Sequence, residues 1–308
     1  MNKAEIRFSV VIPTYNRWAQ LRCSLTAVLR QTYSNYEVIV VDDGSTDNTG
    51  EMIQRVFPQV RYVRQDANRG PAAARNRGIA AASGEIVAFT DDDCVVPPEW
   101  LAKISHGFHR WPDVAGVGGY QEAPDDLLRT NKVAFAEHVM RLRRWGKQAQ
   151  VEQLGGDEVP GLGTNNVAYR RDVLIEVGGF DETFPVAAGE DADLKLRIAQ
   201  RGYRLLYLPL KVCHYREYTI QAQWQMHWRR GVGAYYFEAK HGKAPGMGRI
   251  LFRFLKRTLL FMSDLWTLPW QVAGIIYLSR VADCLGQLQA ARGRMGEKAR
   301  RRRARGET

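Results

Sequence analysis

Cysteine is scarce in this chain. The 308 residues include only four, at Cys23, Cys94, Cys213 and Cys284, and no two of them form a C-x-x-C pair. This spacing supports neither a disulfide framework nor a cysteine zinc site. We therefore expect the protein to reside in a reducing compartment.

The chain also has no secretory signal pattern. Residues 1–7 carry charges of both signs and lead directly into a strand-like run, which leaves no room for an apolar targeting segment. This predicts a cytoplasmic protein. A mean hydropathy of −0.36 excludes a polytopic membrane protein, and 45% hydrophobic with 25% charged residues is an ordinary globular composition.

Several well-known catalytic and phosphate-binding motifs are missing. The sequence contains no G-x-G-x-x-G after its first strand pattern, no G-x-x-x-x-G-K-[ST], no H-E-x-x-H and no G-x-S-x-G. These absences disfavour a dinucleotide-binding Rossmann domain, a P-loop enzyme, a zinc metalloprotease and an esterase.

Positive charge is concentrated at one end. Residues 241–308 contain 14 Lys and Arg against 4 Asp and Glu, so this segment carries +10 of the formal net charge of +11. A basic segment of this kind attracts polyanions such as anionic lipid or nucleic acid, or is simply solvated.

Short apolar runs alternate with segments of helical length over the first 110 residues. Unalternating β-branched runs are typical of strands covered on both faces. The expected strands cover 8–15, 36–44 and 85–91, and the expected helices cover 18–31, 47–56, 70–82 and 98–110. The pattern predicts an α/β fold with a Rossmann-like, mostly parallel sheet. Later segments predict a helix over 190–200 and a strand over 203–210.

Polar and acidic residues follow three of the expected strands, at 13–16, 42–44 and 91–93. In parallel sheets, ligands bind beyond the carboxyl ends of the strands, so these clusters should converge. Strand alternation predicts that Asp91 and Asp93 point to the same side, where they could hold a divalent cation together with a substrate diphosphate. Glu190 and Asp191 begin the later helix, where a carboxylate could act as a general base.

Six motifs in order resemble the family 2 glycosyltransferases of the GT-A fold. They lie at residues 10–16, 41–47, 68–76, 89–93, 179–182 and 189–191, and the resemblance covers about residues 8–215. It implies a transfer of a sugar from a nucleotide-sugar donor, with UDP the expected nucleotide, to an acceptor hydroxyl, with inversion and with Mn²⁺ or Mg²⁺ as cofactor. A lipid-linked, saccharide or small-molecule acceptor is expected, as in polysaccharide or glycolipid biosynthesis.

The resemblance also assigns residues to the site. The base and ribose would contact Pro13, Thr14, Tyr15 and Asp43, and the diphosphate Arg75, Asp91 and Asp92. The metal would bind Asp91 and Asp93, with His214 as a further ligand. The acceptor and donor-sugar loop would include Gly163, Thr164, Asn165 and Glu190, and the catalytic base would be Asp191. No Q-x-x-R-W follows that base, which disfavours processive polymer synthesis.

The expected organisation has three parts. Residues 1–218 form the catalytic domain, with a nucleotide-binding half at 1–110 and an acceptor half at 111–218. Residues 219–295 form a helical, partly apolar region, and 296–308 a basic disordered tail. Within 258–279, one charge, a proline and several aromatics favour an interfacial helical pair on an anionic membrane at the inner face of the cell membrane. A soluble helical subdomain, a dimer face and a membrane span remain as alternatives.

Two other readings of the same residues remain. Residues 91–95 also satisfy the D-x-D-x-[TV] form of aspartate-nucleophile phosphatases, although those enzymes carry it on their first strand. A non-catalytic membrane- or polyanion-binding protein would use the basic tail instead. With the acidic clusters in place we expect an enzyme, and no nucleic-acid partner.

Overall fold

A computed structural model describes residues 5–304, with side chains described for residues 5–294. The chain divides into two compact units. The first comprises residues 1–124, 142–182 and 191–216, and the second comprises 125–141, 183–190 and 217–308. The segment 125–141, expected within the catalytic domain, thus belongs to the second unit.

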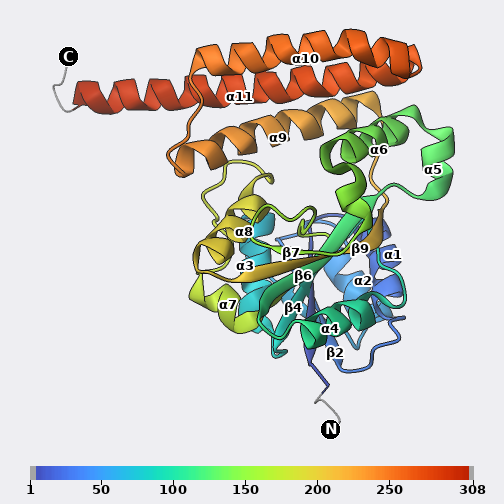
Figure 1. Cartoon of the computed structure of the whole chain (residues 1–308). Helices are drawn as coiled ribbons and strands as arrows, with labels where there is room; N and C mark the ends of the chain where they lie inside the picture. The colour runs from blue at the N-terminus through green and yellow to red at the C-terminus, as the bar shows by residue number, and fades with distance from the viewer. Residues whose placement is uncertain (1–4, 305–308) are drawn as a thin grey trace. The chain divides into compact units, whose positions relative to one another are not determined.

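The first unit has an α/β fold built on one β-sheet with both parallel and antiparallel strands (Figure 1). Its strands run in the order β3-β2-β1-β4-β8-β6-β9-β5, and β7 pairs with β9. Strands β1, β2, β3 and β4 pair in parallel, as do β6 and β9, whereas β8, β5 and β7 run antiparallel to their neighbours. The prediction of a mostly parallel α/β sheet is confirmed. The strands are β1 (Phe8–Thr14), β2 (Tyr36–Asp42), β3 (Arg61–Arg64), β4 (Ile86–Phe89), β5 (Cys94–Val95), β6 (Val114–Glu122), β7 (Gln153–Gly155), β8 (Val167–Arg170) and β9 (Arg204–His214).

Helices cover both faces of this sheet, which explains the continuous apolar strands. On β1, Val10 and Ile12 pack with helices α1, α2 and α4 on one face, while Val11 packs with α3, α7 and α8 on the other. Alternation along the strand assigns neighbouring residues to opposite layers. The helices are α1 (Trp18–Val28), α2 (Thr49–Val56), α3 (Pro71–Ala81), α4 (Trp100–Arg110), α7 (Arg171–Glu176) and α8 (Glu190–Gln200), and η1 (Gly146–Gln150) is a short 3₁₀ helix.

Strand β6 is rich in glycine and was not identified from the sequence. The structure shows why glycine occurs here: a Cβ on Gly119 would lie 2.1 Å from the carbonyl oxygen of Leu210, and one on Gly118 would lie 2.6 Å from that of Asn166. Strand glycines often mark such close backbone approaches. The pairing of β6 with β9 also shifts register between Gly118 and Tyr120.

The second unit is helical. It contains α5 (Asp125–Thr130), most of α6 (Lys132–Trp145), α9 (Ile220–Lys240), α10 (Met247–Thr267) and α11 (Trp270–Ala304). Helix α11 packs against both α9 and α10. A small apolar core joins the three helices and includes Val232 and Tyr235 from α9, Ile250 from α10, and Ala290 and Ala291 from α11.

The apolar segment 258–279 is divided between α10 and α11, which meet at Leu268 and Pro269. Across the part of the chain that the structure describes, no helix is long and apolar enough to cross a membrane. The predicted disordered tail differs from the structure: its backbone is helical as far as Ala304, since alanine, arginine and lysine favour helix. Its side chains and residues 305–308 lie outside the described part.

Candidate active site

The acidic cluster after β4 lies in a turn. Residues 91–93 separate β4 from β5, and the amide of Cys94 donates to the carbonyl of Asp91 at 3.1 Å. The strand alternation that predicted a common direction for Asp91 and Asp93 therefore does not apply here. The two carboxylates contact different partners: Asp91 contacts Arg75, and Asp93 contacts His214.

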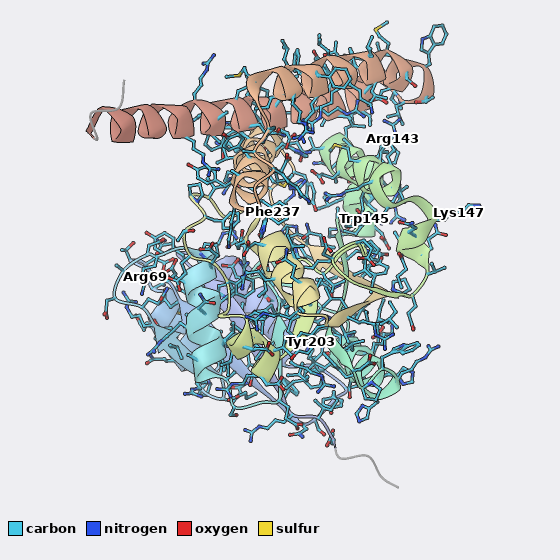
Figure 2. All side chains as sticks on the ribbon, turned by 60° about the vertical axis from the view of Figure 1, so that its left-hand side comes forward. Arg69, Arg143, Trp145, Lys147, Tyr203 and Phe237 are labelled. Atoms are coloured by element: carbon cyan, nitrogen blue, oxygen red, sulfur yellow. The ribbon has the colours of Figure 1, made fainter. Side chains whose placement is uncertain are left out.

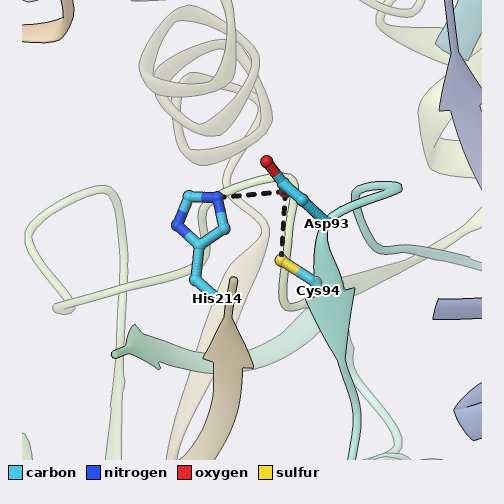
Figure 3. A group of neighbouring side chains, drawn as sticks. All are labelled: Asp93, Cys94 and His214. Carbon is cyan, nitrogen blue, oxygen red and sulfur yellow. Dashed lines mark hydrogen bonds and ion pairs between the residues drawn. The ribbon is translucent and has the colours of Figure 1, made fainter. Parts of the chain in front are cut away.

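Asp93 faces His214, the last residue of β9. The His214 Nε2 atom lies 3.0 Å from Asp93 Oδ1 (Figure 3), and the amide of Tyr215 donates to the Asp93 carbonyl at 2.7 Å. Burial alone would raise the pKa of Asp93, but the hydrogen bond and charge of His214, followed by those of Arg17, outweigh it and lower the pKa to about 2. Asp93 is therefore a carboxylate at neutral pH.

This pair has the chemistry of a cation site. Among residues 5–294, the carboxylate, thiol and imidazole atoms that gather within 4.8 Å of one another belong to Asp93, Cys94 and His214 (Figure 3), and Asp91 is not among them. Burial raises the pKa of the Cys94 thiol well above its ordinary value, and a protonated thiol is a poor ligand. Asp93 and His214 thus fit a divalent ion whose other positions are filled by water or phosphate oxygens.

A basic residue that the sequence analysis did not identify lies at the same place. Arg17 Nη1 contacts Asp92 Oδ1 at 2.9 Å and Asp93 Oδ2 at 3.1 Å. The Asp92 carboxyl also accepts from the hydroxyl of Thr14 at 2.8 Å. Burial raises the pKa of Asp92 to about 6 against the opposing effect of Arg17, and the charge of Asp93 adds to the rise. Arg17 directly follows the cluster 13–16. This position in the sequence could have identified Arg17 as a candidate site residue.

Asp91 instead pairs with Arg75 from α3. Arg75 Nη2 lies 3.0 Å from Asp91 Oδ1, and the guanidinium lies 5.7 Å from the ring centre of Phe180. Arg75 is almost fully buried, whereas Asp91 is partly exposed. Asp91 and Arg75, both predicted at the diphosphate, thus contact one another in the first unit.

Two aspartates at the end of β2 organise the adjacent loops. Asp43 accepts the backbone amides of Arg69 and Gly70, each at 2.8 Å, and the amide of Asp43 donates to the carbonyl of Thr14. Asp43 therefore ties the β2 end to the β1 end and to the start of α3, where Figure 2 labels Arg69. Pro13 and Thr14 are buried in β1, and the Tyr15 side chain is exposed beside them.

Asp42 is buried, and its carboxylate is hydrogen-bonded to other side chains and to the backbone. It is fully buried and accepts from the Tyr62 hydroxyl at 2.6 Å, from Arg64 at 3.2 Å and from the amide of Ser45 at 2.7 Å. Neither Tyr62 nor Arg64 was identified from the sequence, because β3 is short and polar. A fully bonded buried carboxylate of this kind rigidifies the loop that carries Asp43.

Replacing Tyr62 by phenylalanine should therefore destabilise the protein. The substitution leaves a buried carboxylate one donor short, so we expect the free energy of unfolding to fall by about 1–3 kcal/mol in urea denaturation. Tyr203→Phe is the matched control, since the Tyr203 hydroxyl donates to the exposed Glu176 at 2.7 Å. It should cost less than about 0.5 kcal/mol. Equal losses of unfolding free energy in the two variants would contradict the expectation that the hydrogen bond to the buried Asp42 stabilises the protein more.

The loop at 163–165 joins the β4 end to the candidate base. The Thr90 hydroxyl donates to the carbonyl of Asn165 at 3.1 Å, and the Asn165 side chain donates to Gln121. A Cβ on Gly163 would lie 3.7 Å from Asp191 Oδ2. Thr164 is buried in the same loop. The Asp191 carboxylate thus lies beside the loop 163–165. That loop is hydrogen-bonded to Thr90, the residue before Asp91.

Asp191 stands in the first turn of α8. Its Oδ1 atom accepts from the amide of Ala192 at 2.8 Å, and its other oxygen faces Gly163. Glu190 is the first residue of α8, is buried, and belongs to the second unit. Lys195, one turn further along α8, has its pKa lowered to about 8 by burial, against the opposing charges of Asp157 and Asp191.

The predicted motif at 179–182 has a visible role. Asn76 accepts from the amide of Phe180 and donates to its carbonyl, each at 2.8 Å, and also donates to Glu182 at 2.9 Å. Arg69 contacts the same Glu182 carboxylate at 3.0 Å. These hydrogen bonds hold the segment 179–182 against α3, where the Phe180 ring packs against the Arg75 guanidinium.

Comparison with known proteins gives consistent matches. A family model described as "Glycosyl transferase family 2" matches residues 9–178. The glucosyl-dolichyl phosphate glucuronosyltransferase of Haloferax volcanii is 28% identical over 71% of this chain and 72% of its own length. The uncharacterized glycosyltransferase YibD of Escherichia coli is 32% identical over 55% of this chain, which spans only about half of YibD.

A solved structure shares the fold. The mannosyltransferase PcManGT of Pyrobaculum calidifontis, in complex with GDP-Man and Mn²⁺, aligns with a TM-score of 0.65 and 21% identity over 93% of this chain and 88% of its own. The GT-A fold expected from the sequence is therefore present.

Proposed function

Because the chain belongs to glycosyl transferase family 2, we propose that it transfers a sugar from a nucleoside-diphosphate sugar to an acceptor hydroxyl, with inversion at the anomeric carbon. The observation that carries the proposal is the position of Asp191. Its carboxylate faces the loop 163–165, and that loop is bonded to the end of β4, where Asp91 and Asp93 lie. The proposed base, the loop and the strand end proposed for the diphosphate all belong to the first unit.

The donor would bind at the carboxyl ends of β1, β2 and β4. Pro13, Thr14, Tyr15 and Asp43 would contact the base and ribose. Arg75 is suited to the diphosphate because its charge is buried and held in a fixed place by Asp91 and Phe180. Asp91 and Asp92 line the same edge. The acceptor would approach over Gly163, Thr164 and Asn165.

The reaction would be a single displacement. Asp191 accepts the proton of the acceptor hydroxyl, whose oxygen forms a bond to the anomeric carbon as the bond from that carbon to the diphosphate oxygen breaks. Arg75 stabilises the negative charge that develops on the departing nucleoside diphosphate. A divalent ion held by Asp93 and His214, Mn²⁺ or Mg²⁺, would supply further Lewis-acid stabilisation of that charge.

The similar proteins support a class of donor and a class of acceptor for this chain. The resemblance in sequence favours UDP, whereas the solved structure that shares the fold carries GDP-Man and Mn²⁺. The name of the Haloferax volcanii relative indicates a lipid-linked acceptor for that protein. We extend to this chain a nucleotide-sugar donor and a lipid-linked, saccharide or small-molecule acceptor, with peripheral contact with the cytoplasmic face of an anionic membrane.

A ligand-dependent stability measurement tests the donor site. A ligand that binds only the folded state raises its stability by RT ln(1 + [L]/Kd), so a nucleotide at 100 times its Kd should add about 2.7 kcal/mol. The thermal midpoint would be recorded with UDP, GDP, dTDP and CDP, each with Mn²⁺ and with a chelator. A metal-dependent rise with one nucleotide names the base. No rise with any nucleotide at millimolar concentration would contradict the proposal.

A further inference from the structure

Helix α10 directs ion pairs as well as apolar contacts toward its neighbours. Its face toward α9 and α11 holds ion pairs: Arg253 contacts Glu238 at 2.8 Å, Asp264 contacts Arg280 at 2.6 Å, and Arg257 contacts Asp283. Asp264 is almost completely buried. The polar contacts that usually face water therefore lie inside the second unit.

The opposite face of α10 is apolar and exposed. Leu251, Leu255, Leu259, Met262 and Trp266 recur at steps of three and four residues, so they form one stripe along the helix. Leu259 is 73% exposed and Trp266 88% exposed. Figure 2 shows side chains projecting outward along the length of α10. Isolated exposed apolar residues need no explanation, but a continuous stripe of this length does.

The corner between α10 and α11 extends the stripe. Trp270, the first residue of α11, is 71% exposed and lies four residues after Trp266. Tryptophan is enriched at the depth of lipid headgroups, where its ring is partly in hydrocarbon and its N–H remains hydrated. Two exposed tryptophans at one end of an apolar stripe indicate a membrane–water interface.

The charge beside the stripe favours an anionic surface. The charged side chains that α10 exposes are Arg249 and Lys256, and its one carboxylate, Asp264, is buried in an ion pair. A second copy of this chain is disfavoured as the occupant, because packing two α10 stripes together would bring basic residues toward basic residues. Anionic lipid complements them instead.

We infer that the stripe on α10, with Trp270, is an in-plane membrane-binding surface for bilayers that contain anionic lipid. The ion pairs on the other face hold α10 along α11, so the helix would lie parallel to the bilayer with its apolar side chains at the headgroup boundary. The membrane-binding surface deepens the proposed function. Only its consequence, that the acceptor is bound at a membrane, rests on that function.

Co-sedimentation of the full chain with vesicles tests this surface. We expect the protein to sediment with phosphatidylcholine vesicles that contain phosphatidylglycerol. Leu251→Glu/Leu259→Glu should bind at least about tenfold more weakly, because two charges would enter the apolar boundary. Lys256→Gln should bind about fivefold more weakly, as expected for one cation near an anionic surface.

Val151→Glu/Ile175→Glu is the matched control. Both side chains are 56% exposed, as is Leu251, and the change in charge is the same, but neither lies on α10. This variant should sediment like the unmodified protein. Retained thermal midpoints would show that all variants fold.

Three results would overturn the inference. The unmodified protein could stay in the supernatant, the stripe variant could sediment as well as the control variant, or the stripe variant could convert an oligomer into a monomer by light scattering, which would make the stripe a chain–chain interface. Vesicle binding is measured without nucleotide or metal, and nucleotide stabilisation without lipid. Failure of one proposal is therefore distinguishable from failure of the other.

Discussion

Replacing Asp191 by asparagine is expected to lower kcat by about 10²-fold or more while leaving donor binding unchanged. The amide is nearly isosteric and can still accept the hydrogen bond from Ala192, but it cannot take a proton from an acceptor hydroxyl. General-base catalysis typically contributes 10²–10⁴-fold to a rate. Initial rates of sugar transfer and the nucleotide-induced thermal shift, measured on the same preparation, separate the two effects.

Asp172→Asn is a close control for this substitution. Asp172 also stands in the first turn of a helix, and its Oδ1 atom accepts from the next amide at 2.8 Å, as that of Asp191 does. Any loss caused by changing the charge at a helix start should affect both variants equally. Full transfer activity in Asp191→Asn, or equal losses in the two variants, would remove Asp191 from its proposed role.

Asp93→Asn is the second substitution with a large expected effect. It should abolish the metal-dependent part of nucleotide stabilisation and lower turnover by about 10²-fold or more, because a carboxylate ligand to the ion is lost. A chelator added to the unmodified protein should give the same result. His214→Gln should reproduce the loss, since the two side chains approach within 3.0 Å.

The control for Asp93→Asn is the unliganded protein. An asparagine keeps one acceptor oxygen where Asp93 has one for His214 and one for Arg17, so the thermal midpoint without ligands should change less than the midpoint with nucleotide and metal. If Asp93→Asn still binds nucleotide in a metal-dependent way, the ion is held elsewhere and the assignment fails.

The sequence predicted the convergence of the site but not its contacts. The ends of β1, β2 and β4 meet because parallel strands share an edge, and the apolar runs located those ends correctly. The different partners of Asp91 and Asp93 could not be predicted from strand pleating, because these residues lie in a turn. Arg17 was missed for a related reason: its pairing with Asp92 joins residues 75 positions apart.

The limits of the fold prediction have similar causes. Strand β6 was not identified, since the glycines that allow its neighbours to approach closely also weaken its strand pattern. Strand β3 is short, and both of its ends are exposed arginines. The apolar character of 258–279 was visible in the sequence, but the inward direction of the ion pairs on α10 required knowledge of its partners on α9 and α11.

Arg17 has a further consequence for the unliganded protein. Two adjacent carboxylates, Asp92 and Asp93, would repel one another if no cation were near, and the guanidinium of Arg17 acts as a permanent counterion to both. The site should therefore stay assembled between turnovers, without relying on a bound ion to hold it together. Donor and ion would then enter a surface whose negative charge is already partly neutralised, and Arg17, about half exposed, would need only to swing aside.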